Sequence, residues 1–257
     1  MALLALSAGS IEHRKCATFA GENIGRRSCM TLRAIMSILP PAQLALWPLL
    51  LGATDCGFVL YGGTAIALHL GHRQSIDFDF FSHQTLDRGA LVRAMPFLKQ
   101  ATVVQDEPNA WAVLVASPTA IDEPITSPTT VKISFFGGLD FGRVATPDST
   151  EDGVLRVAAL KDLMATKVKV ILQHIEAKDY IDLAAMLRSG ESLPLALAAA
   201  RALYGQAFQP SESLKAMVYF EGGDLATLND DQRVTLITAV SLVRDLPPVA
   251  RLANTLT

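Results

Sequence analysis

Cysteine is scarce in this sequence, and its scarcity excludes two classes of protein. The cysteines of the 257-residue chain are Cys16, Cys29 and Cys56, and no two of them form a C-x-x-C pair. An odd and widely spaced set builds neither a disulfide framework nor a structural zinc site. The cysteines are therefore predicted to be free thiols, as in a protein of the reducing cytoplasm.

An excess of basic residues and a long apolar run are also missing. The 22 Lys and Arg residues against 25 Asp and Glu residues give a formal net charge of −3. A nucleic-acid partner would therefore need a local basic patch. The apolar stretch at residues 42–53 is interrupted by Pro48 and is shorter than the roughly 20 residues that cross a membrane. We expect a cytoplasmic protein with no membrane partner.

Apolar residues are abundant, at 50% of the chain with only 7% aromatic residues, which predicts a folded, helix-rich protein. Residues 1–35 show no clear period and are interpreted as a poorly ordered extension, with Met30 and Met36 as alternative starts to Met1. From Ala158 onward the apolar period changes to 3.6 residues. The expected fold is α/β (α+β), with a mixed sheet flanked by helices in residues 36–157 and a helical half in residues 158–257.

The individual elements follow from the same apolar patterns and from the Gly and Pro residues between them. Strands are expected at residues 58–61, 73–81, 102–105, 111–116 and 131–136. Helices are expected at residues 65–70, 86–99, 158–187 (continuous or with one break), 193–204, 211–217 and 231–244. A loop rich in Pro, Ser and Thr is expected at residues 117–129.

The predicted strand at residues 73–81 alternates polar and apolar side chains. Alternate side chains of a strand share a face, so Arg73, Ser75, Asp77 and Asp79 would lie together, opposite an apolar face that includes Ile76. The two carboxylates would be about 6–7 Å apart at their Cα atoms and would repel each other. A Mg²⁺ ion, which binds carboxylate and phosphate oxygens, would hold them together. Alternatively, Arg73 neutralises them on an ordinary solvated face.

The segment Gly62-Gly63-Thr64 lies between a predicted strand and a predicted helix, which Thr64 would cap. Such a turn exposes backbone N–H groups and a helix N-terminus, which together bind phosphate. The alternative is a turn that needs glycine only for its backbone torsions. One short helix fits between Gly63 and Asp77, so the glycine turn and the carboxylates would face each other. A phosphate cradle facing Mg²⁺ ligands is what nucleotidyl transfer requires.

Two blocks of the sequence carry a family resemblance. Residues 61–81 form the first block, and residues 162–167 with 178–183 form the second. Their spacing resembles the nucleotidyltransferase fold shared with DNA polymerase beta and, more closely, the AbiEii/AbiGii toxin family, over roughly residues 40–187. The resemblance implies a two-lobed enzyme that uses a nucleoside triphosphate and Mg²⁺, acts as a toxin with a cognate antitoxin, and in some members modifies tRNA. The matching positions are Gly63, Ser75, Asp77, Asp79, Lys167 and Asp182.

One departure from that family pattern concerns the number of metal ions. Enzymes of this fold usually carry a third carboxylate on a later strand, where this chain has Ser134. Asp140 follows the glycines after that strand and lies further along the chain. One Mg²⁺ held by Asp77 and Asp79, or a different chemistry, is therefore to be weighed against a two-metal mechanism.

Lys167 occupies the apolar stripe of the predicted helix at residues 158–187. If that helix is unbroken, Lys167, His174, Lys178 and Asp182 fall on one side of it. Lys167 would then meet a triphosphate in a cleft, or it would extend outward to solvent. The spacing of Lys178 and Asp182 is also that of an ordinary surface ion pair, and His174 is expected to be a packing residue.

Three functions compete on these residues. In the first, a nucleotidyltransferase, Gly62, Gly63, Thr64, Arg73 and Ser75 bind the nucleotide and Asp77 and Asp79 hold Mg²⁺. Lys167 offsets charge on the triphosphate, and Asp182 either orients Lys167 or deprotonates the acceptor. The second is a binding module for nucleotide or antitoxin in which catalysis is lost, and the third is a phosphotransferase on the same fold. The acceptor, the preferred triphosphate and the oligomeric state are not encoded in any recognisable motif.

Overall fold

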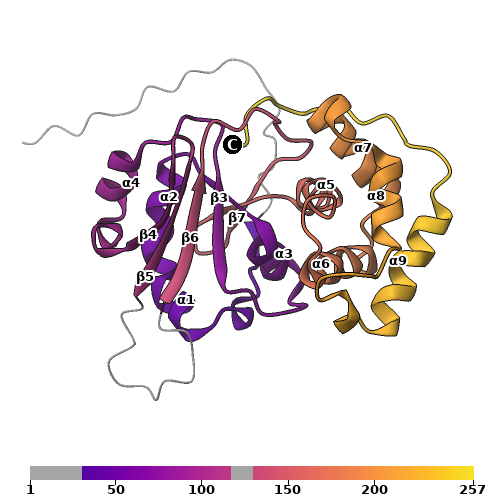
Figure 1. Ribbon diagram of the computed structural model, residues 1–257. Helices are drawn as coiled ribbons and strands as arrows, with labels where there is room; N and C mark the ends of the chain where they lie inside the picture. Colours follow the sequence, from indigo (N-terminus) through magenta and orange to yellow (C-terminus); the bar gives the residue numbers. More distant parts are fainter. Residues whose placement is uncertain (1–30, 117–129) are drawn as a thin grey trace, which may run out of the picture.

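The protein is described by a computed structural model that covers residues 31–116 and 130–257 (Figure 1). Within these residues the strands form one eight-stranded mixed sheet in the order β1-β7-β8-β2-β3-β6-β5-β4. The strands are β1 (Thr31–Leu32), β2 (Val59–Tyr61), β3 (Asp77–Phe81), β4 (Thr102–Glu107), β5 (Ala110–Ala116), β6 (Thr130–Phe136), β7 (Asp148–Thr150) and β8 (Arg156–Val157). The expected mixed sheet is confirmed.

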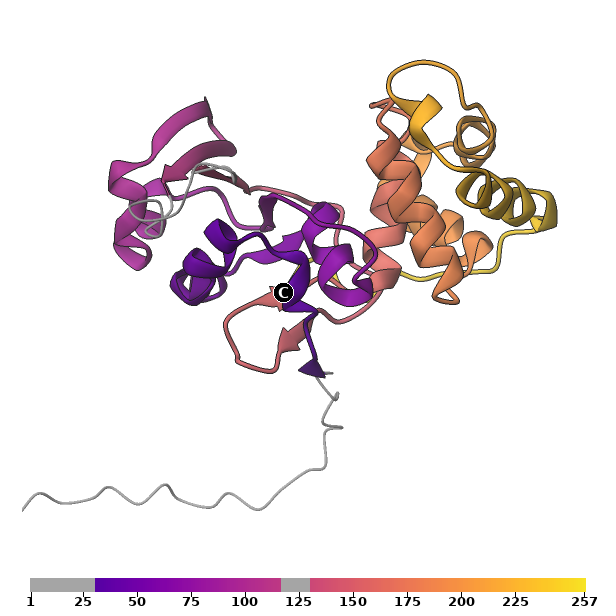
Figure 2. The same cartoon turned by 90° about the horizontal axis from the view of Figure 1, so that it is seen from below.

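The helices lie on both sides of this sheet and then build the second half of the chain. They are α1 (Pro41–Leu46), α2 (Leu51–Asp55), α3 (Gly62–Leu70), α4 (Arg88–Ala94), α5 (Leu160–Val170), α6 (Ala177–Arg188), α7 (Leu193–Tyr204), α8 (Pro210–Met217) and α9 (Asp230–Leu242). Helix α3 contacts β2 and β3 as well as α5 and α6, so it lies between the sheet and the helical half (Figure 1). From Ala158 to Thr257 there is no strand, which confirms the expected helical half, seen as a separate lobe in Figure 2.

Strand β3, in the middle of the sheet, alternates two acidic residues with two buried aromatic residues. Phe78 and Phe80 are fully buried, and the Phe80 ring stacks on Phe135 of β6 at 5.4 Å. Asp77 and Asp79 alternate with them and are only half-buried. The two phenylalanines therefore fix the strand by their burial, and the period of two turns both carboxylates to the opposite face.

Strand β3 is shorter than expected, because it begins at Asp77 rather than at Arg73. Gly71 ends α3 in the left-handed conformation, with φ 66°, and residues 72–76 form a loop. Ile76 was expected on the buried face, but 55% of its surface is exposed. Of the four polar residues expected on one face, only Asp77 and Asp79 therefore belong to the strand, and Arg73 and Ser75 come from the loop.

The long helix expected at residues 158–187 is two helices. Helix α5 ends at Val170 and α6 begins at Ala177. The backbone of the turn between them is held by the Asp224 carboxylate, which accepts from the Ala177 N–H at 2.6 Å. The break brings α6 back against α5, so the helical-wheel relation of Lys167 to residues 174–182 does not hold.

The first residues of the described chain belong to the sheet. Strand β1 pairs in parallel with β7, and the Ile35 N–H donates to the Leu68 carbonyl at 2.9 Å. Residues 31–35, predicted to belong to a poorly ordered extension, are therefore part of the folded structure. Residues 1–30 lie outside the described part, as do Cys16, Cys29 and the loop expected at 117–129. Cys56 is a free thiol, and no helix among the described residues is both long and apolar enough to cross a membrane.

The C-terminal tail, residues 243–257, returns from α9 to the sheet (Figure 1). The Leu252 N–H donates to the Arg143 carbonyl at 2.8 Å, and the Arg143 N–H donates to Ala253 at 2.9 Å. The Arg143 guanidinium also donates to the carbonyls of Thr255 and Thr257, and Leu256 is fully buried. The last residues of the chain therefore pack with the first half rather than with the helices that precede them.

Asp162 links α5 to the loop that receives this tail. Its carboxylate, 2% exposed, accepts from the backbone N–H groups of Val144 and Ala145 at 2.7 and 3.0 Å. Burial nevertheless raises the pKa of Asp162 to about 6, because burial penalises the charge more than these bonds and Arg143 favour it. The carboxyl group therefore gains a proton more readily in the folded chain than in the unfolded chain.

Asp162 gives a testable pH dependence. Because its pKa is raised on folding, its contribution to the free energy of unfolding is greatest below about pH 4 and falls by up to about 3 kcal/mol as the pH rises through about 6. Asp162→Asn should lack this fall, so the stability difference between wild type and variant should be larger at about pH 4 than at pH 7. Urea unfolding at both pH values, with the exposed Asp140→Asn as control, checks this. If the stability difference between wild type and Asp162→Asn were equal or larger at pH 7, the two N–H bonds would lower the pKa of Asp162 by more than burial raises it.

Candidate functional site

A cavity of about 600 Å³ lies between the sheet and the helical half. The strand half lines it with Gly62, Gly63, Arg73, Ser75, Asp77 and Asp79, and the helical half lines it with Thr166, Lys167, Glu176, Lys178 and Asp179. Seven of the nine residues that the sequence singled out therefore share one cavity. The two exceptions, Thr64 and Asp182, are buried behind its wall, at 1% and 0% exposure.

The carboxylate pair of β3 faces this cavity. Asp77 and Asp79 oppose Lys132 and Ser134 of the parallel strand β6. Burial raises the pKa of Asp79, and the negative charge of Asp77 raises it further. A hydrogen bond from the Ser134 hydroxyl and the positive charges of Lys132 and Lys167 lower it, but by less. The position predicted for a third carboxylate is therefore adjacent to the pair, and there Ser134 supplies a hydroxyl in place of a charge.

These oxygens fit one Mg²⁺ ion. Mg²⁺ takes hard oxygen ligands, keeps several waters, and is usually bound through one or two carboxylates together with substrate phosphates. Burial raises the pKa of Asp79 in spite of the charges of Lys132 and Lys167, so a bound cation would further favour the charged form of this carboxylate. No group of three or more His, Cys, Asp or Glu side chains in the described residues could hold a metal, so an ion between Asp77 and Asp79 would take its other ligands from hydroxyl, backbone, water or substrate oxygens.

The glycine turn is built differently from the prediction. Helix α3 begins at Gly62, and its N-cap, Tyr61, makes no side-chain hydrogen bond. Thr64 therefore does not cap the helix. Its hydroxyl is directed at the Ser75 hydroxyl, 2.7 Å away, and at the Asp77 carbonyl. Thr64 thus ties the loop before β3 to the first turn of α3, and it supports the cavity wall rather than lining the cavity.

The two glycines are required for different reasons. Gly62 has φ 73°, and a Cβ there would lie 2.6 Å from Asp79 Oδ2. Gly63 has no positive φ, and its Cβ would lie 2.3 Å from Arg73 Nη2. Of the two glycines in the turn, only Gly62 therefore needs the backbone freedom of glycine. Gly63 instead leaves room for the guanidinium group beside the start of α3.

We therefore predict separable effects of alanine at the two glycines. Gly62→Ala should lower the free energy of unfolding by about 1–3 kcal/mol, because a positive φ and the contact with Asp79 are both unfavourable. Gly63→Ala should act through Arg73 instead, because its Cβ would displace the Nη2 that donates to the buried Asp182. Urea unfolding of both variants, alone and combined with Arg73→Ala, measures the difference: Gly63→Ala should have little further effect once Arg73 is removed, whereas Gly62→Ala should keep its full effect. An unchanged effect of Gly63→Ala in the absence of Arg73 would contradict this.

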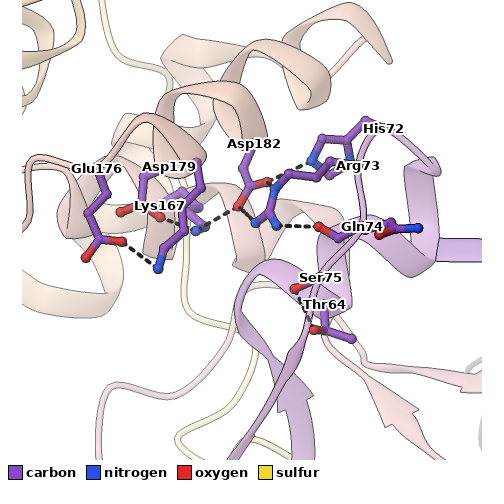
Figure 3. Close-up of polar contacts among 10 residues, drawn as sticks. Thr64, His72, Arg73, Gln74, Ser75, Lys167, Glu176, Asp179 and Asp182 are labelled. Carbon is purple, nitrogen blue, oxygen red and sulfur yellow. Dashed lines mark hydrogen bonds and ion pairs between the residues drawn. The ribbon is translucent and has the colours of Figure 1, made fainter. Parts of the chain in front are cut away.

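Asp182 is the centre of an ion cluster formed by His72, Arg73, Lys167, Asp179 and Asp182 (Figure 3). Its Oδ1 accepts from Arg73 Nε at 2.6 Å and from His72 Nε2 at 2.7 Å. Its Oδ2 accepts from Arg73 Nη2 at 2.9 Å and pairs with Lys167 Nζ at 2.8 Å. Burial alone would raise the pKa of Asp182, but hydrogen bonds from His72 and Arg73 and the charge of Lys167 hold it well below its usual range.

Lys167 reaches the cavity wall from α5. It is 7% exposed and pairs with Asp179 at 2.5 Å as well as with Asp182. The interpretation in which Lys167 extends outward to solvent is therefore wrong, and its predicted direction into the cavity is confirmed. The predicted pair of Lys178 with Asp182 does not form; Lys178 pairs instead with Glu176 at 2.5 Å.

His72 and Asp179 are members of the ion cluster that the sequence did not reveal. Asp179 lies three residues before Asp182 on α6 and shares its face, so its spacing carried a signal. His72 carried little signal, because its partner is 110 residues away in the chain. The remaining wall of the cavity is mostly apolar and includes Ile66, Phe81, Phe136, Leu163 and Val170. Gln74 and the exposed His174 add polar groups to it, so His174 is not the packing residue that was expected.

Comparison with known proteins places this site in a family. Residues 45–240 match the family model described as nucleotidyl transferase AbiEii toxin, type IV TA system. The chain is also 27% identical over 133 residues to an uncharacterized protein of Aquifex aeolicus (strain VF5), a match that covers 51% of this chain and 58% of that protein. The family match includes the glycine turn, both aspartates of β3 and the whole ion cluster. The chain therefore belongs to the AbiEii family of nucleotidyl transferase toxins of type IV toxin–antitoxin systems.

Proposed function

We propose that the protein transfers a nucleotidyl group from a nucleoside triphosphate to a hydroxyl group of a nucleic-acid acceptor such as tRNA, as the toxin of a pair with a cognate antitoxin. The observation that carries the proposal is one cavity that holds the first turn of α3, the two carboxylates of β3 and Lys167. Free N–H groups at a helix start bind phosphate, and a buried lysine offsets negative charge on a triphosphate. An adjacent apolar wall provides contact area for a base or a sugar.

In this reaction the acceptor oxygen bonds to the α-phosphorus while the bond from that phosphorus to the bridging β-oxygen breaks. Pyrophosphate leaves with its electron pair, and the acceptor proton passes to water in the cavity. Asp77 and Asp79 would hold Mg²⁺, which when bound offsets charge on the phosphate oxygens. Gly62, Gly63 and Ser75 would face the phosphates, and Lys167 would neutralise charge that develops on the leaving pyrophosphate.

Asp182 fits an orienting role rather than that of a base. It is fully buried, does not line the cavity, and already accepts from three side chains. Its lowered pKa also makes it a poor proton acceptor. Arg73 donates from Nε and Nη2 to Asp182 and from Nη1 to the Gln74 carbonyl. Because these groups are already engaged, Arg73 would border the phosphate site rather than act as its main phosphate ligand.

One observation favours a second candidate. Ser134 occupies the place beside Asp79 where the third carboxylate was expected, which is compatible with a module that binds nucleotide without catalysis. Incubation with each α-labelled triphosphate, Mg²⁺, total RNA and total protein separates the candidates. We expect label in RNA, equimolar pyrophosphate, and loss of both on chelation. Mg²⁺-dependent triphosphate binding without any product would favour the binding module, and release of nucleoside diphosphate would indicate a phosphotransferase.

A further inference from the structure

His72 is placed at the junction of the two halves. It directly follows Gly71, the residue that ends α3, and its side chain is 11% exposed. Its Nε2 lies 2.7 Å from Asp182 Oδ1, whereas its buried Nδ1 has no hydrogen-bond partner. The ring is therefore held through one nitrogen only, and the bond it makes is to the central carboxylate of the ion cluster.

The charges of the cluster define the role of this ring. The carboxylates of Asp179 and Asp182 are balanced by the cations of Lys167 and Arg73. A neutral His72 that carries its proton on Nε2 leaves this balance intact and donates to Oδ1, and Nδ1 then needs no proton and no acceptor. His72 thus contributes a directed hydrogen bond to a buried group rather than a further charge.

That hydrogen bond bears on the direction of the Asp182 carboxylate. His72 Nε2 and Arg73 Nε both approach Oδ1, so Oδ2 faces Lys167 Nζ at 2.8 Å (Figure 3). Lys167 lines the cavity and Asp182 does not. Without the His72 donor, only the Arg73 guanidinium and Lys167 hold the carboxylate, and it can shift with the Arg73 side chain away from Lys167.

We propose that His72 is a positioning residue of the transfer reaction, whose Nε2–H fixes the Asp182 carboxylate so that Lys167 Nζ stays directed into the cavity. The inference rests on the proposed function for its kinetic part only. The geometric part, a neutral Nε2–H ring bound to Asp182, is independent of any activity.

The kinetic arm compares His72→Ala with His72→Gln, whose side-chain amide can donate at a similar reach. If Lys167 acts on charge that develops during transfer, His72→Ala should lower kcat at least about tenfold and change KM for the triphosphate less than about threefold. His72→Gln should recover most of the loss. His69→Ala is the matched control, because His69 lies on α3, bonds to the Ala158 carbonyl and does not line the cavity. It should leave kcat unchanged.

The second arm is ¹⁵N NMR of the full chain labelled in its five histidines. The signal lost in His72→Gln should be that of a neutral ring protonated at Nε2 in the wild type, and it should change to an averaged tautomer signal in Asp182→Asn. A ring protonated at Nδ1, or one unaffected by Asp182→Asn, would overturn the geometric part. If the ring is as expected but His72→Ala keeps full kcat, or His72→Gln behaves as alanine does, positioning is wrong. A wild type inactive on every triphosphate would instead refute the proposed function and leave the NMR result standing.

Discussion

Asp77→Asn is expected to reduce Mg²⁺-dependent nucleotidyl transfer by about a thousandfold or more, because a bound cation supplies several kcal/mol of charge stabilisation. Asparagine keeps the shape and one carbonyl ligand but loses the charge that a hard cation requires. The fold should survive, since Asp77 is only half-buried and lies on the cavity face of β3. Removing its charge also removes one cause of the raised pKa of Asp79, so the melting temperature without metal should stay equal or rise slightly.

The matched control for this result is Asp140→Asn. Asp140 is exposed and does not line the cavity. Its variant should keep full activity and full stabilisation by Mg²⁺ with triphosphate. Thermal melting with and without these ligands, beside a transfer assay, measures both variants. Full activity and ligand stabilisation in Asp77→Asn would reduce the carboxylate pair to an ordinary polar face.

Asp182→Asn is expected to have the largest effect on stability, a loss of about 3–5 kcal/mol, because it leaves buried cations without their partner. An asparagine amide would also direct N–H groups at Arg73 or Lys167, which are donors only. The variant should lose transfer activity as well, since Lys167 would keep only Asp179 as a partner and Arg73 would lose the carboxylate that holds it at the cavity wall. Urea unfolding at pH 7 and the transfer assay provide the two measurements.

Asp179→Asn is the control from the same helix. Lys167 keeps Asp182 as a partner in this variant, so the loss should be only about 1–2 kcal/mol. The pH dependence gives a second check. Because the pKa of Asp182 is lowered on folding, its contribution is fully present above about pH 4 and is lost as the pH falls further. The stability difference between wild type and Asp182→Asn should shrink only below about pH 4. Equal losses in the two variants would contradict a central role for Asp182.

Local pattern was sufficient for the parts of the site that depend on one element. The strict alternation of Asp77, Phe78, Asp79 and Phe80 predicted both carboxylates on one face. A shift of the strand by one residue would expose the two phenylalanines and bury the two aspartates, so only one register is favourable. The change of period at Ala158 likewise predicted the helical half, because amphipathic helices carry their periodicity in the sequence. Both predictions are confirmed by the structure.

Local pattern was insufficient where a tertiary contact decides the geometry. The helical wheel through Lys167 assumed one unbroken helix, and the turn at residues 171–176 instead folds α6 back so that Asp182 meets Lys167. Thr64 was placed as a cap because its residue type favours that role, but its hydroxyl reaches Ser75 and Asp77 on a different segment. His72 could not be identified, since the partner that gives it a role lies 110 residues away in the chain.

The return of the C-terminal tail to the sheet has a consequence for how the molecule unfolds. Arg143 binds residues 252–257 after the chain has passed through every helix, and Arg251 donates to the carbonyls of Ala202 and Leu203 on α7 along the way. The tail therefore contacts both halves of the molecule, and neither half keeps all its packing when the other unfolds. Because of these shared contacts, we expect unfolding to be a single cooperative transition, in spite of the two-lobed outline of the molecule.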